Sequence, residues 1–114
     1  MVEKPWGREI WWAVTEKYVG KIIEVRGGES LSLQYHREKM ESLYFLRGRG
    51  TLTLGEDRRP IREGLAVTIE PGTVHRIEAE TDLVIFEVST PEVEDVVRLE
   101  DRYGRTEVGV PLAK

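Results

Sequence analysis

Residues 28 to 48, GESLSLQYHREKMESLYFLRG, decide the fold class of this chain. Two short runs in it, Leu31 to His36 and Glu41 to Arg47, are rich in residues that favour β-strands and are too short to be typical helices. A charged connector, residues 37 to 39, separates the two runs, and Gly48 ends the second. The stretch therefore predicts two neighbouring strands joined by a short loop.

Similar runs recur along the chain between clusters of Gly, Pro and Asp. They are Tyr18 to Arg26, Gly50 to Leu54, Leu65 to Glu70, His75 to Glu78 and Leu83 to Ser89. Turn signals at this spacing are typical of an antiparallel barrel or sandwich. The sequence predicts an all-β fold.

Residues 91 to 99, PEVEDVVRL, depart from this pattern. Val93, Val96 and Val97 lie near helical spacing, and the acidic residues come early, where a helix dipole favours them. We predict a short C-terminal helix that caps the barrel.

Length and composition bound the function. At 114 residues we expect a single domain, residues 1 to 114. No apolar run approaches the ~20 residues of a membrane span, and nothing near the first residue resembles a signal peptide, so we expect a cytoplasmic protein. The net charge of −4 is spread along the chain, which argues against nucleic acid and favours a small-molecule partner. The absence of cysteine excludes thiolate metal sites and thiol nucleophiles.

The two histidines of the chain lie where strands and turns can aim them into a barrel. Gln34 and His36 project to the same face of one strand, because side chains alternate along it. Glu41 opens the next strand and can face the same interior. His75 follows the tight turn of residues 70 to 74 and can reach the same cavity. Gln34, His36, Glu41 and His75 are therefore predicted to bind one divalent metal, Zn²⁺, Mn²⁺, Fe²⁺, Co²⁺ or Ni²⁺.

A family resemblance appears at these residues. The segment from Gly28 to Gly48 resembles the first cupin motif, and residues 64 to 79, GLAVTIEPGTVHRIEA, resemble the second. Many cupins have a histidine where this chain has Gln34, whereas phosphomannose isomerases of the superfamily use a Gln, His, Glu, His set. Further matches, KPWG at residues 4 to 7 and VRLEDRYGR at residues 97 to 105, make the chain similar to the isomerase domain of type II mannose-6-phosphate isomerases.

The resemblance implies a cupin jelly-roll barrel that interconverts mannose 6-phosphate and fructose 6-phosphate. In the family an arginine important for activity precedes the ligand glutamate, and Lys39 occupies that position here. Lys39 and Arg76 are the predicted catalytic residues, and Arg98 and Arg105 the predicted phosphate ligands. The sequence leaves the catalytic base open between Lys39 and a metal-bound hydroxide.

Two other functions stay open at this point. A non-catalytic cupin that binds a sugar or sugar nucleotide is favoured by the change to Lys39, and a metal-dependent dioxygenase is compatible with the same ligands. Gln34 either ligates the metal or hydrogen-bonds to a ligand or water. Because small cupins commonly pair, a homodimer is expected.

Overall fold

The computed structural model describes residues 1–104, which form eleven β-strands and no helix. The strands are β1 (Val2–Lys4), β2 (Gly7–Val14), β3 (Val19–Val25), β4 (Leu33–Tyr35), β5 (Glu41–Arg47), β6 (Gly50–Leu54), β7 (Asp57–Ile61), β8 (Ala66–Ile69), β9 (His75–Ala79), β10 (Leu83–Ser89) and β11 (Val97–Glu100). This part of the chain therefore offers no helical segment able to span a bilayer.

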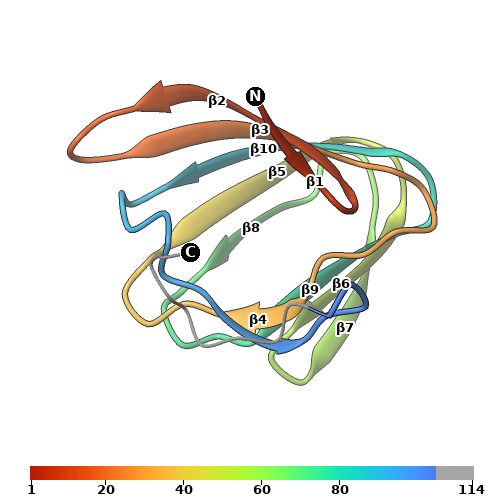
Figure 1. Ribbon diagram of the computed structural model, residues 1–114. Helices are drawn as coiled ribbons and strands as arrows, with labels where there is room; N and C mark the ends of the chain where they lie inside the picture. The colour runs from red at the N-terminus through yellow and green to blue at the C-terminus, as the bar shows by residue number, and fades with distance from the viewer. Residues whose placement is uncertain (105–114) are drawn as a thin grey trace.

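The strands form two antiparallel sheets that face one another (Figure 1). The six-stranded sheet has the order β1-β2-β3-β10-β5-β8, and the five-stranded sheet has the order β11-β4-β9-β6-β7. Strands distant in sequence are neighbours in both sheets, as in a jelly roll. The predicted all-β barrel is confirmed.

Three predicted strands, residues 41–47, 50–54 and 83–89, have the observed bounds. The other predicted runs contain strands that end within a few residues of the expected positions. The N-terminal hairpin of β1 and β2 and the edge strand β7 were not predicted. The sequence of β7, DRRPI, reads as a turn, but charged residues and proline are also typical of an edge strand, which is where β7 lies.

The predicted C-terminal helix over residues 91 to 99 is wrong. Residues 91 to 96 form turns, and β11 follows and pairs with β4. Val97 lies opposite Tyr35 in this pairing and is buried, so its apolar side chain is accommodated by a strand rather than by a helix face.

The barrel interior is divided along its length into an apolar and a polar end. Along β10 the inward residues Leu83 and Ile85 are apolar, whereas Glu87 and Ser89 beyond them are polar and also buried. The same change occurs along β5 and β9, which begin with buried Glu41 and His75. The apolar cluster comprises Trp6, Ile23, Val25, Leu43, Phe45, Leu52, Ile61, Ile69, Ile77, Ala79, Leu83 and Ile85. The polar end therefore forms a cavity closed by a packed core.

Two phenylalanines test this assignment of inner and outer faces. Phe45 is 0% exposed, whereas Phe86 lies on the outer face of the same sheet and is 40% exposed. We expect Phe45→Ala to lower the free energy of unfolding by about 3–5 kcal/mol, because it leaves a cavity in the core. Phe86→Ala should cost clearly less. Urea denaturation of both variants measures the difference, and equal losses would contradict the assignment.

Candidate metal centre

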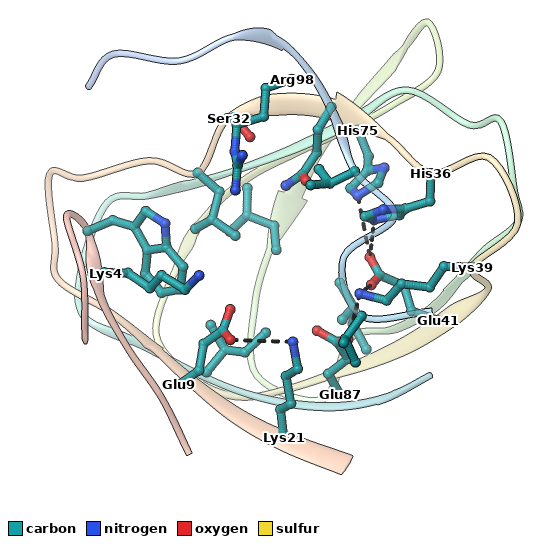
Figure 2. A pocket seen from close by; sticks show the side chains of 18 of the residues that line it. Lys4, Glu9, Lys21, Ser32, His36, Lys39, Glu41, His75, Glu87 and Arg98 are labelled. Atoms are coloured by element: carbon teal, nitrogen blue, oxygen red, sulfur yellow. Dashed lines mark hydrogen bonds and ion pairs between the residues drawn. The ribbon is translucent and has the colours of Figure 1, made fainter. Parts of the chain in front are cut away.

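Three buried side chains, His36, Glu41 and His75, meet at the polar end of the barrel (Figure 2). His36 directly follows β4, whereas Glu41 and His75 begin β5 and β9. Glu41 Oε2 lies 3.7 Å from His36 Nε2 and 3.4 Å from His75 Nε2. One potential ligand atom of each residue lies within 4.8 Å of the others. The consecutive strands β4 and β5 and the more distant strand β9 thus bring two imidazoles and a carboxylate to one point.

Backbone carbonyls set the orientation of both imidazoles. His36 Nδ1 donates to the Asp95 carbonyl at 2.5 Å, and His75 Nδ1 donates to the Thr73 carbonyl at 2.9 Å. Since a carbonyl oxygen only accepts, each Nδ1 must carry the proton. In the neutral rings, both Nε2 lone pairs then face the carboxylate oxygen of Glu41.

This arrangement fits a bound cation. Two Nε2 lone pairs and a carboxylate oxygen repel one another unless a positive charge lies between them. Protons on both Nε2 atoms would instead create two imidazolium ions with ring centroids 5.1 Å apart. A divalent ion satisfies all three atoms at once, and histidines that donate Nδ1–H to a carbonyl are typical of metal sites.

Electrostatics keep the Glu41 carboxyl ionised. Burial alone would raise its pKa, but hydrogen bonds donated by protonated imidazoles of His36 and His75, together with the Lys39 ammonium, hold the pKa well below its ordinary value. A metal ion in place of the imidazole protons would act in the same direction. The carboxylate is therefore present as the anion that a cation requires.

The connector between His36 and Glu41 is fixed by Asp95. The Asp95 carboxylate accepts hydrogen bonds from the backbone N–H groups of Arg37, Glu38 and Lys39 at 3.0, 2.6 and 3.0 Å. Its carbonyl also accepts from His36. One residue of the segment before β11 thus positions both the loop and the imidazole.

The turn before β9 fixes the other imidazole. Gly72 has a φ of 86°, which other residues rarely adopt, and its N–H donates to the His36 carbonyl at 2.7 Å. The turn is thereby tied to the end of β4, next to His75. Gln34 lies opposite His75 in the pairing of β4 with β9 and lines the same cavity.

Lys39 is buried between two carboxylates. Its Nζ lies 3.2 Å from Glu41 Oε1 and 3.3 Å from Glu87 Oε2. Burial would lower the pKa of Lys39, but the two carboxylates raise it above its ordinary value. Burial raises the pKa of Glu87, and the nearby Glu41 acts in the same direction while Lys39 opposes it.

A second charged pair lies on the far wall of the cavity. Glu9 Oε1 accepts hydrogen bonds from Lys21 Nζ at 3.3 Å and from Trp11 Nε1 at 2.8 Å. The Lys21 ammonium also lies 4.3 Å from the centre of the Trp11 ring, a cation–π contact. Burial raises the pKa of Glu9, but Lys21 and Lys4 outweigh burial and lower it.

The cavity between these groups has an excess of cationic side chains. Of the side chains lining it in the described part of the chain, four are cationic and three are carboxylates: Lys4, Lys21, Lys39 and Arg98, and Glu9, Glu41 and Glu87. A bound divalent metal would increase the positive charge further. The site therefore suits an anionic small molecule.

The predicted arginines are placed differently. Arg98 on β11 lines the cavity (Figure 2). Arg76 lies on the face of β9 opposite to His75, where its guanidinium donates to the Leu31 carbonyl and pairs with Glu100. Arg105 lies outside the described residues.

Sequence reasoning missed Lys21, Glu87, Glu9 and Lys4 as residues lining the cavity. Along β10, every second position from residue 84 is apolar: Val84, Phe86 and Val88. Alternation alone would therefore direct these side chains inward and Glu87 outward. The structure has the opposite orientation. Lys21 could have been recognised from the sequence of β3. It is a lysine within an apolar run, and it lies on the same face of the strand as the buried apolar residues at every second position.

Residues 21–89 match a family model described as the cupin domain. Because the match covers more than half of the sequence, the chain belongs to the cupin family. It is 35% identical over 109 residues to mannose-1-phosphate guanylyltransferase ManC of Salmonella typhimurium, across 91% of this chain and 23% of that protein. Xanthan biosynthesis protein XanB of Xanthomonas campestris is 32% identical over 110 residues, which are 92% of this chain and 24% of the relative. The chain thus spans about a quarter of these relatives and resembles their C-terminal region, which confirms the predicted resemblance.

Solved structures support the same assignment. A putative sugar phosphate isomerase from Acidithiobacillus ferrooxidans matches with a TM-score of 0.60 and 26% identity, over 65% of this chain and 50% of that chain. A Klebsiella pneumoniae protein with a double-stranded β-helix domain matches with a TM-score of 0.72 and 16% identity, over 88% and 91% of the two chains. The second match shows the fold alone.

The Asp95 contacts predict a pH-dependent contribution to stability. Burial raises the Asp95 pKa, but the three backbone N–H groups outweigh burial and lower it below its ordinary 3.8. We expect Asp95→Asn to reduce the free energy of unfolding by roughly 1–2 kcal/mol at neutral pH. Because the folded-state pKa is the lower one, the difference from wild type should persist above pH 3.8 and shrink as pH falls further. Denaturation curves across pH test this, with exposed Glu94→Gln as the control; a difference independent of pH would contradict it.

Proposed function

We propose that this protein is a metal-dependent sugar-phosphate isomerase that interconverts mannose 6-phosphate and fructose 6-phosphate. The observation that carries the proposal is the group of His36, Glu41 and His75 in a cavity lined by more cations than carboxylates. An aldose–ketose isomerase needs a cation near the sugar carbonyl and positive charge for the phosphate. The sequence similarity to the guanylyltransferase relatives and to the putative sugar phosphate isomerase supports this substrate class.

In this proposal Gln34, His36, Glu41 and His75 hold the metal, which is Zn²⁺, Mn²⁺, Fe²⁺, Co²⁺ or Ni²⁺. When bound, such an ion supplies a Lewis acid that polarises a carbonyl oxygen and stabilises negative charge on it. The mixed nitrogen and oxygen donors suit all of these ions.

The remaining roles belong to cationic side chains. Lys39 holds a fixed positive charge beside Glu41 and stabilises the oxyanion that forms during isomerisation. Arg98 reaches into the cavity from β11 and binds the phosphate, with Arg105 as its expected partner. Arg76 is committed to Leu31 and Glu100 on the outer face, and the proposal therefore gives it no catalytic role.

Metal binding can be tested without substrate. Wild-type protein, stripped with chelator and titrated with Zn²⁺ or Mn²⁺, should bind one ion per chain. Removing a residue that only hydrogen-bonds to a metal ligand typically weakens metal binding by about 10–100-fold. Glu41→Gln removes the carboxylate anion of a ligand itself, so it should weaken binding by more than that. Glu38→Gln, in the exposed part of the same connector, is the matched control. Calorimetry that finds equal affinity for Glu41→Gln and wild type would reject the site.

The activity is tested by loading purified protein with each of the five metals and measuring conversion of mannose 6-phosphate to fructose 6-phosphate. We expect turnover with at least one metal. Unphosphorylated mannose at the same concentration should give none, because it lacks the phosphate that the cationic side chains of the cavity would bind. No turnover of mannose 6-phosphate with any metal would reject the isomerase function.

Two rival functions can be distinguished from the isomerase, and the donor set favours the first of them. Two histidines and one carboxylate are also the donors of Fe²⁺ oxygenases. Oxygen consumption by the Fe²⁺ form without isomerisation would favour a dioxygenase. Binding of a sugar phosphate or sugar nucleotide without any turnover would favour the non-catalytic cupin that Lys39 suggested.

We also propose that the protein is a cytoplasmic homodimer, as predicted from the sequence. Exposed apolar side chains on the outer face of the six-stranded sheet suit such a contact; they include Trp12, Tyr44, Phe86 and Val88. A second copy packed on this face would remove them from water.

A further inference from the structure

Glu87 is a buried carboxylate on the cavity wall. Its side chain is on the inner face of β10, directly opposite Lys21 on β3 and Leu43 on β5, and it is 4% exposed. Figure 2 shows it beside Lys39 and next to the candidate metal centre. Burying a carboxylate costs free energy, so its presence among the apolar residues of β10 calls for a functional reason.

Among the three cavity carboxylates of the described residues, Glu87 differs in how its oxygens are engaged. Glu87 Oε2 is buried and lies at ion-pair distance from Lys39, yet it accepts no hydrogen bond. Glu9 accepts two hydrogen bonds, and Glu41 faces the histidines. Glu87 therefore retains an oxygen able to accept a proton inside the cavity.

Lys39 has a different task. Its ammonium lies between Glu41 and Glu87 and balances the charge of both. It is placed to face negative charge that develops on the sugar, and it holds the Glu87 carboxylate beside the candidate metal centre.

We propose that Glu87 is the base that moves a proton between C2 and C1 of the bound sugar, a role that rests on the isomerase function proposed above. Starting from the open-chain aldehyde form of mannose 6-phosphate, Glu87 accepts the proton of C2. The electron pair of the broken C–H bond forms the C1–C2 double bond, and the carbonyl oxygen of C1 becomes an oxyanion. Glu87 then returns the proton to C1, the hydroxyl proton of O2 passes to O1, and the C2 carbonyl forms. Atoms and electrons balance without any co-reactant.

The experiment measures cleavage of the C2–deuterium bond in mannose 6-phosphate deuterated at C2, using full-length protein loaded with its most active metal. Glu87→Gln keeps the shape of the side chain but removes the basic oxygen. It should slow bond cleavage and isomerisation by about 10²–10⁴-fold, while metal and substrate binding remain. Glu56→Gln removes an exposed carboxylate between β6 and β7, outside the cavity lining, and should retain both rates, which makes it the control.

A second variant separates catalysis from structure. In Glu87→Ala, added formate should restore bond cleavage in proportion to its concentration, an effect that a structural role would not produce. Wild-type rates in Glu87→Gln would overturn the assignment. Loss of activity together with loss of bound metal, and without rescue by formate, would also overturn it. Wild-type protein that cleaves nothing with any metal would instead overturn the isomerase function itself.

Discussion

Two imidazoles turn their free nitrogens toward one carboxylate oxygen, and the polar end of the barrel is organised around this meeting. The Nδ1 atoms of both rings donate to backbone carbonyls, so both Nε2 atoms face Glu41 and suit a shared cation. The Asp95 contacts and the turn at Gly72 hold the elements that carry the rings. The fold thus positions a set of donors that is electrostatically incomplete by itself, which is what a binding site for a metal needs.

Buried side chains of alternating charge continue from this centre along the cavity wall and form the charged floor of the cavity. Glu41, Lys39, Glu87, Lys21 and Glu9 succeed one another with alternating sign. Strand register produces part of this order, since Trp11, Lys21, Glu87 and Leu43 are cross-strand neighbours. The attraction within a buried ion pair does little more than offset the free energy lost when its charges leave water. Apolar residues in these positions would therefore be at least as stable. The charged floor is therefore better explained by function than by folding.

The sequence predicted the barrel and the convergence of His36, Glu41 and His75 because both follow from short-range rules. Alternation places Gln34 with His36, and Gly72 permits the tight turn before His75. What it could not predict depends on partners distant in sequence. The valines near helical spacing in residues 91 to 99 become part of a turn and of β11, because β4 offers a pairing edge. The outward orientation of Phe86 likewise follows from the neighbouring strands and not from the apolar pattern of β10 itself.

Lys39, in place of the arginine that the family resemblance implies, is consistent with this charged floor. A compact ammonium fits between two carboxylates that approach from β5 and β10, whereas a planar guanidinium offers a wider fork suited to gripping an anion by two bonds. A lysine at this position pairs with Glu41 and Glu87 and lacks the two-bond geometry that grips a phosphate. In the proposed reaction the phosphate must then be held elsewhere, and Arg98 on β11 lines the cavity with the fork geometry that Lys39 lacks. Arg98 has contacts of its own within the protein, and these would have to give way to the substrate. Under the proposed function, the phosphate is therefore bound by exchange of contacts at Arg98 rather than by a fixed grip from Lys39.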